Sequence, residues 1–386
     1  MRLNDESLLV SSRRVCATVA VSLGLGGFGH LEAGVLPAAA IASGGVESAA
    51  STNVKPPVKV RSKYRPRAYS IEFTSPPTMQ PRSFKGEASL LQRLSNVRIL
   101  LLGVNADDEK GLQFTADNFL DRLIMAALNG GKKEVILSLD NTMPSETRAI
   151  FEAVAKSKNV KLLDSGVDHA TVSRVAVKGF EGLTDEDRSR YVPDPQDFVS
   201  SVTSKGFKRY ADNVIVDNYN RAAQQLVREG KTEKDMPSSE KFFASQILEN
   251  EGTAATLAKS AVQNKDRIVV LVTDSKRVKF GYGVKERSKK LLNVVSEGSA
   301  GADDTDDVLS VLIDPTPADS LSETAQLRLT LAYGQFLEDQ RPLADFVWFS
   351  EEPPLRVLTR IKNPIGKEGD KPAGESSVIG AFNARK

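Results

Sequence analysis

Residues 97–177 alternate short apolar runs with segments of helical periodicity, and this alternation is the feature that most constrains the fold. Val97–Gly103 is a nearly continuous apolar run that ends in Gly, as in a strand buried on both faces of a parallel sheet. The apolar residues of Gln113–Leu128 recur at helical spacing, and Asn129-Gly130-Gly131 ends that segment. Alternation of this kind implies βαβ units, so we expect an α/β fold with a mostly parallel β-sheet flanked by helices.

The same two patterns predict the remaining elements. Thr184 followed by three acidic residues is typical of a capped helix start, and Ser145 is the expected cap of the helix over 145–156. A helical insertion is expected at about 184–262. Further strands are predicted at 68–73 (an edge strand), 134–140, 160–163, 267–273, 277–282, 308–313 and 346–349, and further helices at 170–177, 207–229, 239–263 and 321–337.

The first 42 residues have the three parts of a targeting signal. Arg13-Arg14 directly precedes the uncharged stretch Val15–Gly29, and a small-residue run, Pro37–Ala42, follows. We interpret residues 1–42 as an export signal of the twin-arginine type. A plastid or mitochondrial transit segment and an uncleaved anchor helix are the alternatives. Gly24–Gly29 matches G-x-G-x-x-G, but no strand–helix context surrounds it, so we do not interpret it as a dinucleotide site.

Export would determine where the protein is located and which Cys and His residues the mature chain keeps. In a photosynthetic eukaryote the destination would be the chloroplast thylakoid lumen, and otherwise the periplasm. Cleavage would remove Cys16 and His30 and leave His169 as the only imidazole. With two His and one Cys in the whole chain, a His-rich zinc centre and a disulfide framework are excluded.

Composition divides the rest of the chain into three parts. Residues 43–94 are basic and rich in Pro and Ser, typical of a linker; residues 95–355 are the expected α/β domain; residues 356–386 are a polar C-terminal tail. Lys and Arg total 52 against 50 Asp and Glu, for a net charge of +2. This balance argues against nucleic acid as a partner.

Four stretches in order along residues 95–355 resemble one family, the ChaN-like haem-binding proteins of the superfamily that includes the Tiki proteases. They are Ser165–Tyr191, Phe243–Ala258, Ile268–Arg287 and Ala344–Ser350. The resemblance implies the family's α/β fold, and it implies haem or a related tetrapyrrole as the first ligand to test.

The sequence departs from the family at the positions tied to metal-dependent chemistry. Where the family has Gly-Glu-x-His after the first strand, this chain has Gly103-Val104-Asn105-Ala106, and a second family His falls at Arg277. Only Asp140, after the second strand, keeps a family acid in kind. A permanent cation at position 277 cannot serve as a metal ligand. We therefore expect no catalytic residue, no metal site and no enzyme activity.

Four residues are the candidates for cofactor binding: His169, Tyr282, Arg277 and Arg287. His169 follows a strand at the expected carboxyl edge of the sheet, and Tyr282 lies between two glycines that would let a flat ring approach. His and Tyr can ligate haem iron, and Arg277, Arg287 and Lys285 could pair with propionates. Alternatively, His169 caps a helix, Tyr282 packs as a turn aromatic, and the two arginines are solvated or form ion pairs.

A second class of function stays open, a cofactor-free interaction or assembly module that keeps the fold as an accessory subunit of a protein complex at a membrane surface. The basic stretch Lys55–Arg67 and the acidic loop Ser296–Asp307 would then be the contact elements; the loop lacks the ligand spacing of a calcium site.

A serine hydrolase has no support, because the chain has no G-x-S-x-G elbow.

Overall fold

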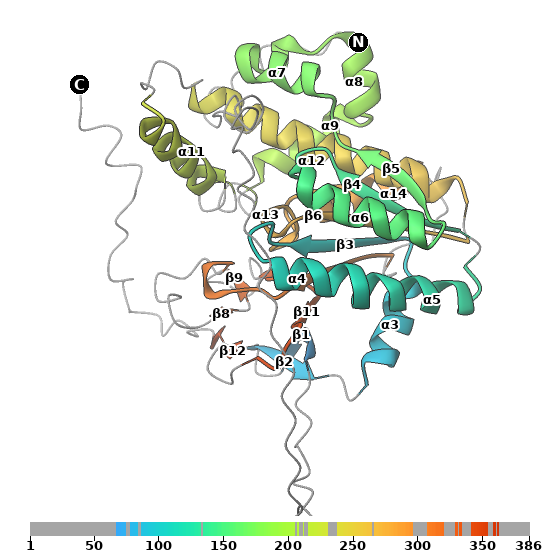
Figure 1. Cartoon of the computed structure of the whole chain (residues 1–386). Helices are drawn as coiled ribbons and strands as arrows, with labels where there is room; N and C mark the ends of the chain where they lie inside the picture. The colour runs from blue at the N-terminus through green and yellow to red at the C-terminus, as the bar shows by residue number, and fades with distance from the viewer. Residues whose placement is uncertain are drawn as a thin grey trace, which may run out of the picture.

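The computed structural model describes a layered α/β fold (Figure 1). The described residues are 67–74, 78–83, 86–132, 134–204, 207, 211, 215–230, 238–264, 266–295, 307–319, 329–330, 332–333, 341–353, 358–359 and 361–362. The predicted export signal, most of the predicted linker, most of the acidic loop and most of the predicted tail lie outside these residues. In the part of the chain that is described, no helix is both long enough and apolar enough to cross a membrane.

A nine-stranded sheet forms the centre of the described fold, with strand order β13-β2-β1-β11-β7-β3-β6-β4-β5. The six strands from β11 to β5 are parallel, and β1, β2 and β13 extend the sheet in antiparallel fashion at one edge. The strands are β1 (Ala68–Thr74), β2 (Thr78–Ser83), β3 (Ile99–Val104), β4 (Glu134–Asp140), β5 (Lys161–Ser165), β6 (Arg267–Asp274), β7 (Val308–Ile313), β11 (Phe346–Trp348) and β13 (Ile361–Lys362). This confirms the predicted fold class.

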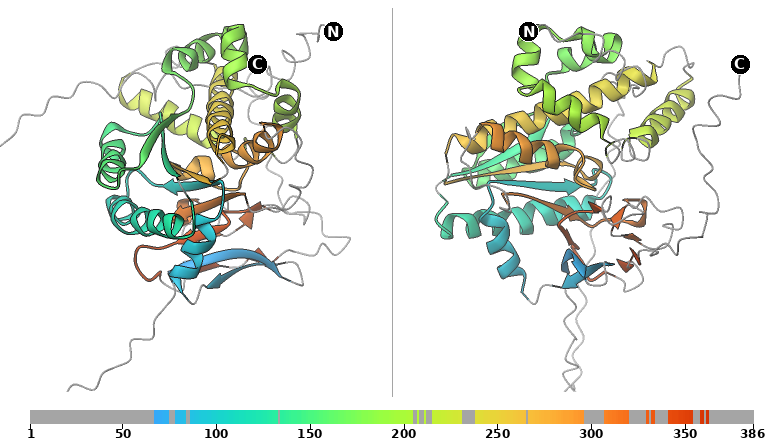
Figure 2. Two further views of the ribbon diagram at one scale, coloured as in Figure 1. Left: turned by 90° about the vertical axis from the view of Figure 1, so that its right-hand side faces the viewer. Right: turned by 180° about the vertical axis from the view of Figure 1, so that it is seen from behind.

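Helices cover both faces of the parallel part of the sheet (Figure 2). One layer comprises α3 (Glu87–Ser95), α4 (Glu109–Phe114), the π-helical turn Thr115–Leu120, α5 (Asp121–Asn129) and α6 (Ser145–Ser157). The other comprises α7 (His169–Lys178), α8 (Asp185–Tyr191), α9 (Pro195–Thr203), α11 (Val216–Arg228), α12 (Ser239–Val262), α13 (Ser275–Val278) and α14 (Val284–Val295).

Alternate side chains of β3 enter two different cores, which explains the continuous apolar run. Ile99 and Leu101 pack with α7, α12 and α14, whereas Leu100 and Leu102 pack with α3, α5 and α6. All four side chains are fully buried. Because the strand is covered on both faces, nearly all of its side chains are apolar, which gives the continuous apolar run in the sequence.

The predicted strand over 277–282 is wrong. Residues 275–278 form α13, and a tight turn follows in which Phe280 (φ 63°) and Gly281 (φ 71°) have left-handed backbone. Two consecutive residues in this region cannot continue a strand. The turn is held from outside, because the Phe280 amide donates to the carbonyl of Leu343 over 2.8 Å.

Five further predictions need correction. The folded part begins before residue 95, since β1, β2 and α3 lie within the stretch interpreted as a linker. The strand predicted at 68–73 is β1, but it is not an edge strand, because it lies between β2 and β11. Within the predicted helix 321–337 the described residues are short strands, β8 (Leu329–Thr330) and β9 (Ala332–Tyr333), and β12 (Leu358–Thr359) and β13 lie in the predicted tail. Pro144, not Ser145, occupies the N-cap position of α6.

The predicted helical insertion is confirmed, and α12 is its central element. Thr184 caps α8 in a capping box with Asp187, as its sequence predicts. The helix α12 runs across the sheet and is covered by α7, α8 and α14 (Figure 2). Gly252 permits this close packing, because a Cβ there would lie 2.5 Å from Cγ2 of Val167.

Candidate functional site: a closed polar centre at the carboxyl edge of the sheet

Asp140 lies at the carboxyl edge of the parallel sheet, where α/β folds usually place their ligands. It is the last residue of β4 and is 1% exposed. The Thr273 hydroxyl, near the end of the neighbouring strand β6, donates to Oδ2 of Asp140. The amide and hydroxyl of Thr142 donate to Oδ1, each over 3.0 Å. Asp140 is therefore held by neighbours on both sides.

Arg277 of α13 closes this centre. Its Nη1 forms an ion pair with Oδ2 of Asp140, and only 11% of the Arg277 side chain is exposed. Its Nε donates to Oδ1 of Asn250 and its Nη2 to the hydroxyl of Thr253, each over 3.0 Å. Since Asn250 and Thr253 belong to α12, the guanidinium joins the sheet edge to the central helix.

Within this centre the charged form of Asp140 is stabilised, whereas the charged form of Glu249 is disfavoured. Burial opposes ionisation of Asp140, but Arg277 and the donors Thr273 and Thr142 outweigh it and hold the pKa of Asp140 below its ordinary value. Glu249, one residue before Asn250, is 4% exposed. Burial, helped by the charge of Asp140, raises the pKa of Glu249 to about 7 despite the attraction of Arg277.

This raised pKa predicts a pH-dependent stability. Because the pKa of Glu249 is higher in the folded chain than in the unfolded chain, its contribution is complete below pH 4.5 and is lost as the pH rises to about 7. We expect Glu249→Gln to remove this loss, and so to gain up to about 3 kcal/mol relative to wild type between pH 4.5 and pH 8. Urea unfolding of both proteins at the two pH values measures this gain. If the difference in unfolding free energy between Glu249→Gln and wild type is the same at pH 4.5 and pH 8, the prediction is contradicted.

A second buried ion cluster ties α12 to α14 and α9. The Arg287 guanidinium of α14 donates through Nε and Nη2 to the two carboxylate oxygens of Glu251, which is fully buried. Its Nη1 donates to Asp197 and, over 2.8 Å, to the hydroxyl of Ser201, both on α9. The five donors of a guanidinium suit such a three-helix junction.

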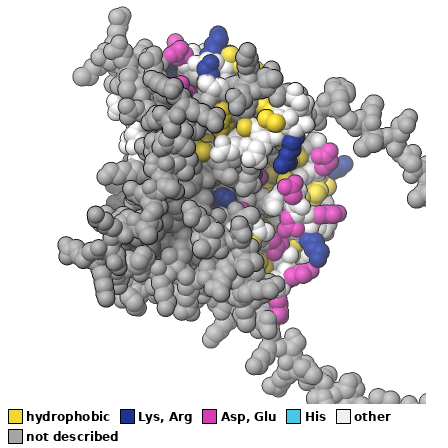
Figure 3. All heavy atoms as spheres, turned by 90° about the vertical axis from the view of Figure 1, so that its left-hand side faces the viewer, with side chains coloured by type: hydrophobic (Ala, Val, Ile, Leu, Met, Phe, Trp, Pro, Cys, Tyr) yellow, Lys and Arg dark blue, Asp and Glu magenta, His cyan; other side chains and the backbone are white. Residues whose placement is uncertain are grey.

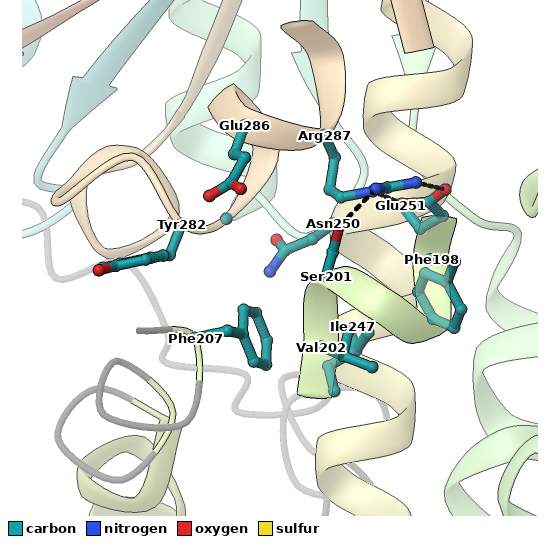
Figure 4. Close-up of a pocket in the computed structure, with 11 residues that line it drawn as sticks. Phe198, Ser201, Val202, Phe207, Ile247, Asn250, Glu251, Tyr282, Glu286 and Arg287 are labelled. Carbon is teal, nitrogen blue, oxygen red and sulfur yellow. Dashed lines mark hydrogen bonds and ion pairs between the residues drawn. The ribbon is translucent and has the colours of Figure 1, made fainter. Parts of the chain in front are cut away.

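Tyr282 and Arg287 border one small cavity of about 10 Å³, shown in Figure 4, which has room for about one water molecule. In that view Phe198, Phe207 and Ile247 close its other side. Tyr282 is 5% exposed, and the guanidinium carbon of Arg341 lies 5.0 Å from the centre of its ring. Arg277 does not line the cavity but reaches its wall through Asn250.

His169 lies apart from these residues. It is the exposed first residue of α7, which follows β5 at the carboxyl edge as expected. The helix cap is its neighbour Asp168, whose carboxylate accepts the Thr171 amide over 2.9 Å. The structure thus joins two of the four predicted residues, Tyr282 and Arg287, at one cavity and places Arg277 in the adjacent network.

The acidic and polar residues of α12 were not predicted as part of the site. Glu249, Asn250 and Glu251 are consecutive in the sequence, and all three are buried between apolar turns of the helix. Three adjacent polar residues within an otherwise apolar helix were the available signal. Among the described residues, no group of three or more His, Cys, Asp or Glu is placed to hold a metal ion.

The described surface fits the balanced composition. On the face shown in Figure 3, Asp and Glu side chains lie among Lys and Arg side chains. Arg67, the last residue of the predicted basic contact stretch, is committed to the fold, because it donates to Glu87 over 2.8 Å and to the Ser350 carbonyl over 2.8 Å. The remainder of that stretch lies outside the described residues.

The fold and this centre define a class: an α/β protein with six parallel strands whose carboxyl edge is filled by an internal ion pair. Residues 145–287 match the model of the family described as haem-binding uptake, Tiki superfamily, ChaN. This segment extends from α6 to Arg287 and includes His169, Arg277 and Tyr282. The match confirms the resemblance to the ChaN-like haem-binding family.

A solved structure described as cofacial heme binding to ChaN of Campylobacter jejuni is similar over 73% of this chain and 96% of that chain, at 11% identity and a TM-score of 0.40. The search of curated proteins gave no match.

Proposed function

We propose that this protein is a non-catalytic interaction or assembly module built on a ChaN-like domain. The supporting observation is the closed centre, in which Asp140 is occupied by Arg277, Thr273 and Thr142. A hydrolytic metal site needs convergent, unoccupied ligands and an open position for water. Here the carboxylate at the end of β4 is already paired with a fixed cation, Arg277.

The interaction proposal is tested on the full-length tagged protein in its native host. We expect it to migrate in a defined larger complex under gentle extraction, and we expect deletion of residues 296–306, which removes most of the acidic loop, to release it. Replacement of that loop by an equally long Gly/Ser segment controls for chain length. Migration of the intact protein as a free monomer would contradict the proposal.

Haem or a related tetrapyrrole is the second candidate, and the family match to residues 145–287 favours it. The described residues do not fit this ligand as one pocket. The cavity beside Tyr282 has room for about one water molecule, the guanidinium of Arg287 is already bound by Glu251 and Asp197, and His169 does not line the cavity. A tetrapyrrole would need an opening of this region or a different surface.

A haem titration distinguishes the two candidates. For an interaction module we expect no Soret band above that of free haem at micromolar haem. The tetrapyrrole candidate predicts a Soret shift that Tyr282→Phe or His169→Ala weakens, with Tyr219→Phe, a tyrosine on α11 outside the cavity, as the matched control. A saturable shift that both site variants reduce and the control does not would replace the first proposal by the second.

We further propose that residues 1–42 direct export and are removed, with the destination expected from the sequence. Mass spectrometry of the native protein tests this through its N-terminal peptide. We expect a mature chain that begins close to residue 43, and a native N-terminal peptide that contains Arg13 and Arg14 would contradict it.

A further inference from the structure

A larger hollow lies between α14, the beginning of β7 and the short strand β10 (Arg341–Pro342), outside the polar centre. Its volume is about 240 Å³, close to the lower end of the range for small-molecule sites. Lys285, Lys289 and Arg341 bring three positive charges to it, and Phe280, Val308 and Pro342 provide apolar walls. We call this hollow the basic pocket.

The two acidic residues of the basic pocket do not neutralise it equally. Asp345 is fully used within the fold: Oδ1 accepts from Lys285 over 2.6 Å, and Oδ2 accepts from the amide and hydroxyl of Ser310 over 2.7 and 2.8 Å. Glu286 is only loosely paired, since its carboxylate lies 3.9 Å from both Arg341 and Lys290. These separations are too long for hydrogen bonds.

Lys289 and Arg341 therefore have N–H donors available for a ligand. Lys289 is exposed and has no ion pair or hydrogen bond to any of the residues that the structure describes. The Arg341 guanidinium lies over the ring of Tyr282, with its carbon 5.0 Å from the ring centre. Packing on an aromatic face holds the planar group in place and leaves its N–H edges for an anion.

We infer that the basic pocket binds a compact organic anion, with its phosphate or carboxylate group held by Lys289 and Arg341 and its apolar body against Phe280 and Val308. Charge-assisted hydrogen bonds from a lysine and a planar guanidinium are the usual recognition of such groups. The apolar walls select a ligand with a hydrophobic part over an inorganic ion. This inference depends neither on the interaction proposal nor on haem.

Calorimetric titration of the full chain at low salt with phenyl phosphate, benzoate, inorganic phosphate and benzyl alcohol tests the inference. We expect saturable binding of phenyl phosphate or benzoate, weaker binding of inorganic phosphate and none of benzyl alcohol. The tighter of the two aromatic anions identifies the acidic group. No saturable binding of either one would overturn the inference.

Variants locate the site. We expect Lys289→Gln and Arg341→Gln each to weaken binding about tenfold, the loss of one charged hydrogen bond. Glu286→Gln should tighten it, because a repelling carboxylate is removed. Lys178→Gln, an exposed lysine at the end of α7, is the matched control. Because Lys289 is exposed, its variant should fold normally. The inference would be overturned if Lys289→Gln bound as tightly as wild type, or if Lys178→Gln lost as much affinity as Lys289→Gln.

Discussion

Replacement of Arg277 by Met is expected to lower the free energy of unfolding by about 3–5 kcal/mol, as removal of one partner from a buried ion pair usually does. The variant leaves Asp140, which is 1% exposed, without its cation, and it also removes the donors to Asn250 and Thr253. Urea unfolding at pH 7 measures the change.

The pH dependence gives this prediction a signature. In wild type the pKa of Asp140 is held low, so its contribution to stability is lost as the pH falls. Without Arg277, burial dominates and raises that pKa, so the contribution of Asp140 is instead lost as the pH rises. The difference between the two proteins should therefore be largest near neutral pH and shrink in acid.

Two controls accompany Arg277→Met. Adding Asp140→Asn to the variant removes the uncompensated charge and should recover part of the loss. Arg148→Met breaks the more exposed pairs of Arg148 with Glu152 and Asp164 and should cost less than about 1 kcal/mol. If Arg277→Met lowers the free energy of unfolding no more than Arg148→Met does, the Asp140–Arg277 ion pair does not stabilise the fold as we describe.

Arg287→Met is expected to have an effect of similar size, about 3–5 kcal/mol, because it leaves the fully buried Glu251 unpaired. It also removes the donors that hold Asp197 and Ser201 of α9. We therefore expect hydrogen exchange in α9 to accelerate more than in β3. Uniform acceleration of α9 and β3, or a loss of less than 1 kcal/mol, would contradict the three-helix junction.

A double variant separates charge from packing in the same junction. Arg287→Met combined with Glu251→Leu replaces both charges by apolar side chains of similar length. Such replacements of a buried pair are often neutral or stabilising, so the double variant should be more stable than Arg287→Met alone. A further loss would show that Glu251 acts through contacts other than its pair with Arg287.

The sequence predicts the parallel sheet well because its strands are buried on both faces. In β3, β4, β6 and β7 nearly every residue is buried, so the apolar runs mark their positions within one or two residues. The prediction of a strand over 277–282 was wrong because the apolar residues there suggest a strand, whereas the turn depends on a contact of Phe280 with the distant Leu343. Local patterns do not report such a contact.

The polar centre was predictable only in part. Asp140 and Arg277 were identified as the positions where this chain departs from the family or keeps its acid, and the structure brings these two side chains together. The partners on α12 could not be assigned, because a helix of 24 residues has no solvent-facing stripe that would show where Glu249 and Glu251 point. Their environment is set by α13 and α14, which follow them in the chain.

Calorimetric titration of the purified protein with Mn²⁺ or Zn²⁺ shows directly whether Arg277 closes the carboxyl edge of the sheet at Asp140. We expect no stoichiometric binding that depends on Asp140, so wild type and Asp140→Asn should give the same heats. Binding of one metal ion per chain that is lost in Asp140→Asn would contradict it, because the Arg277 guanidinium would then have to leave the place it has in this structure.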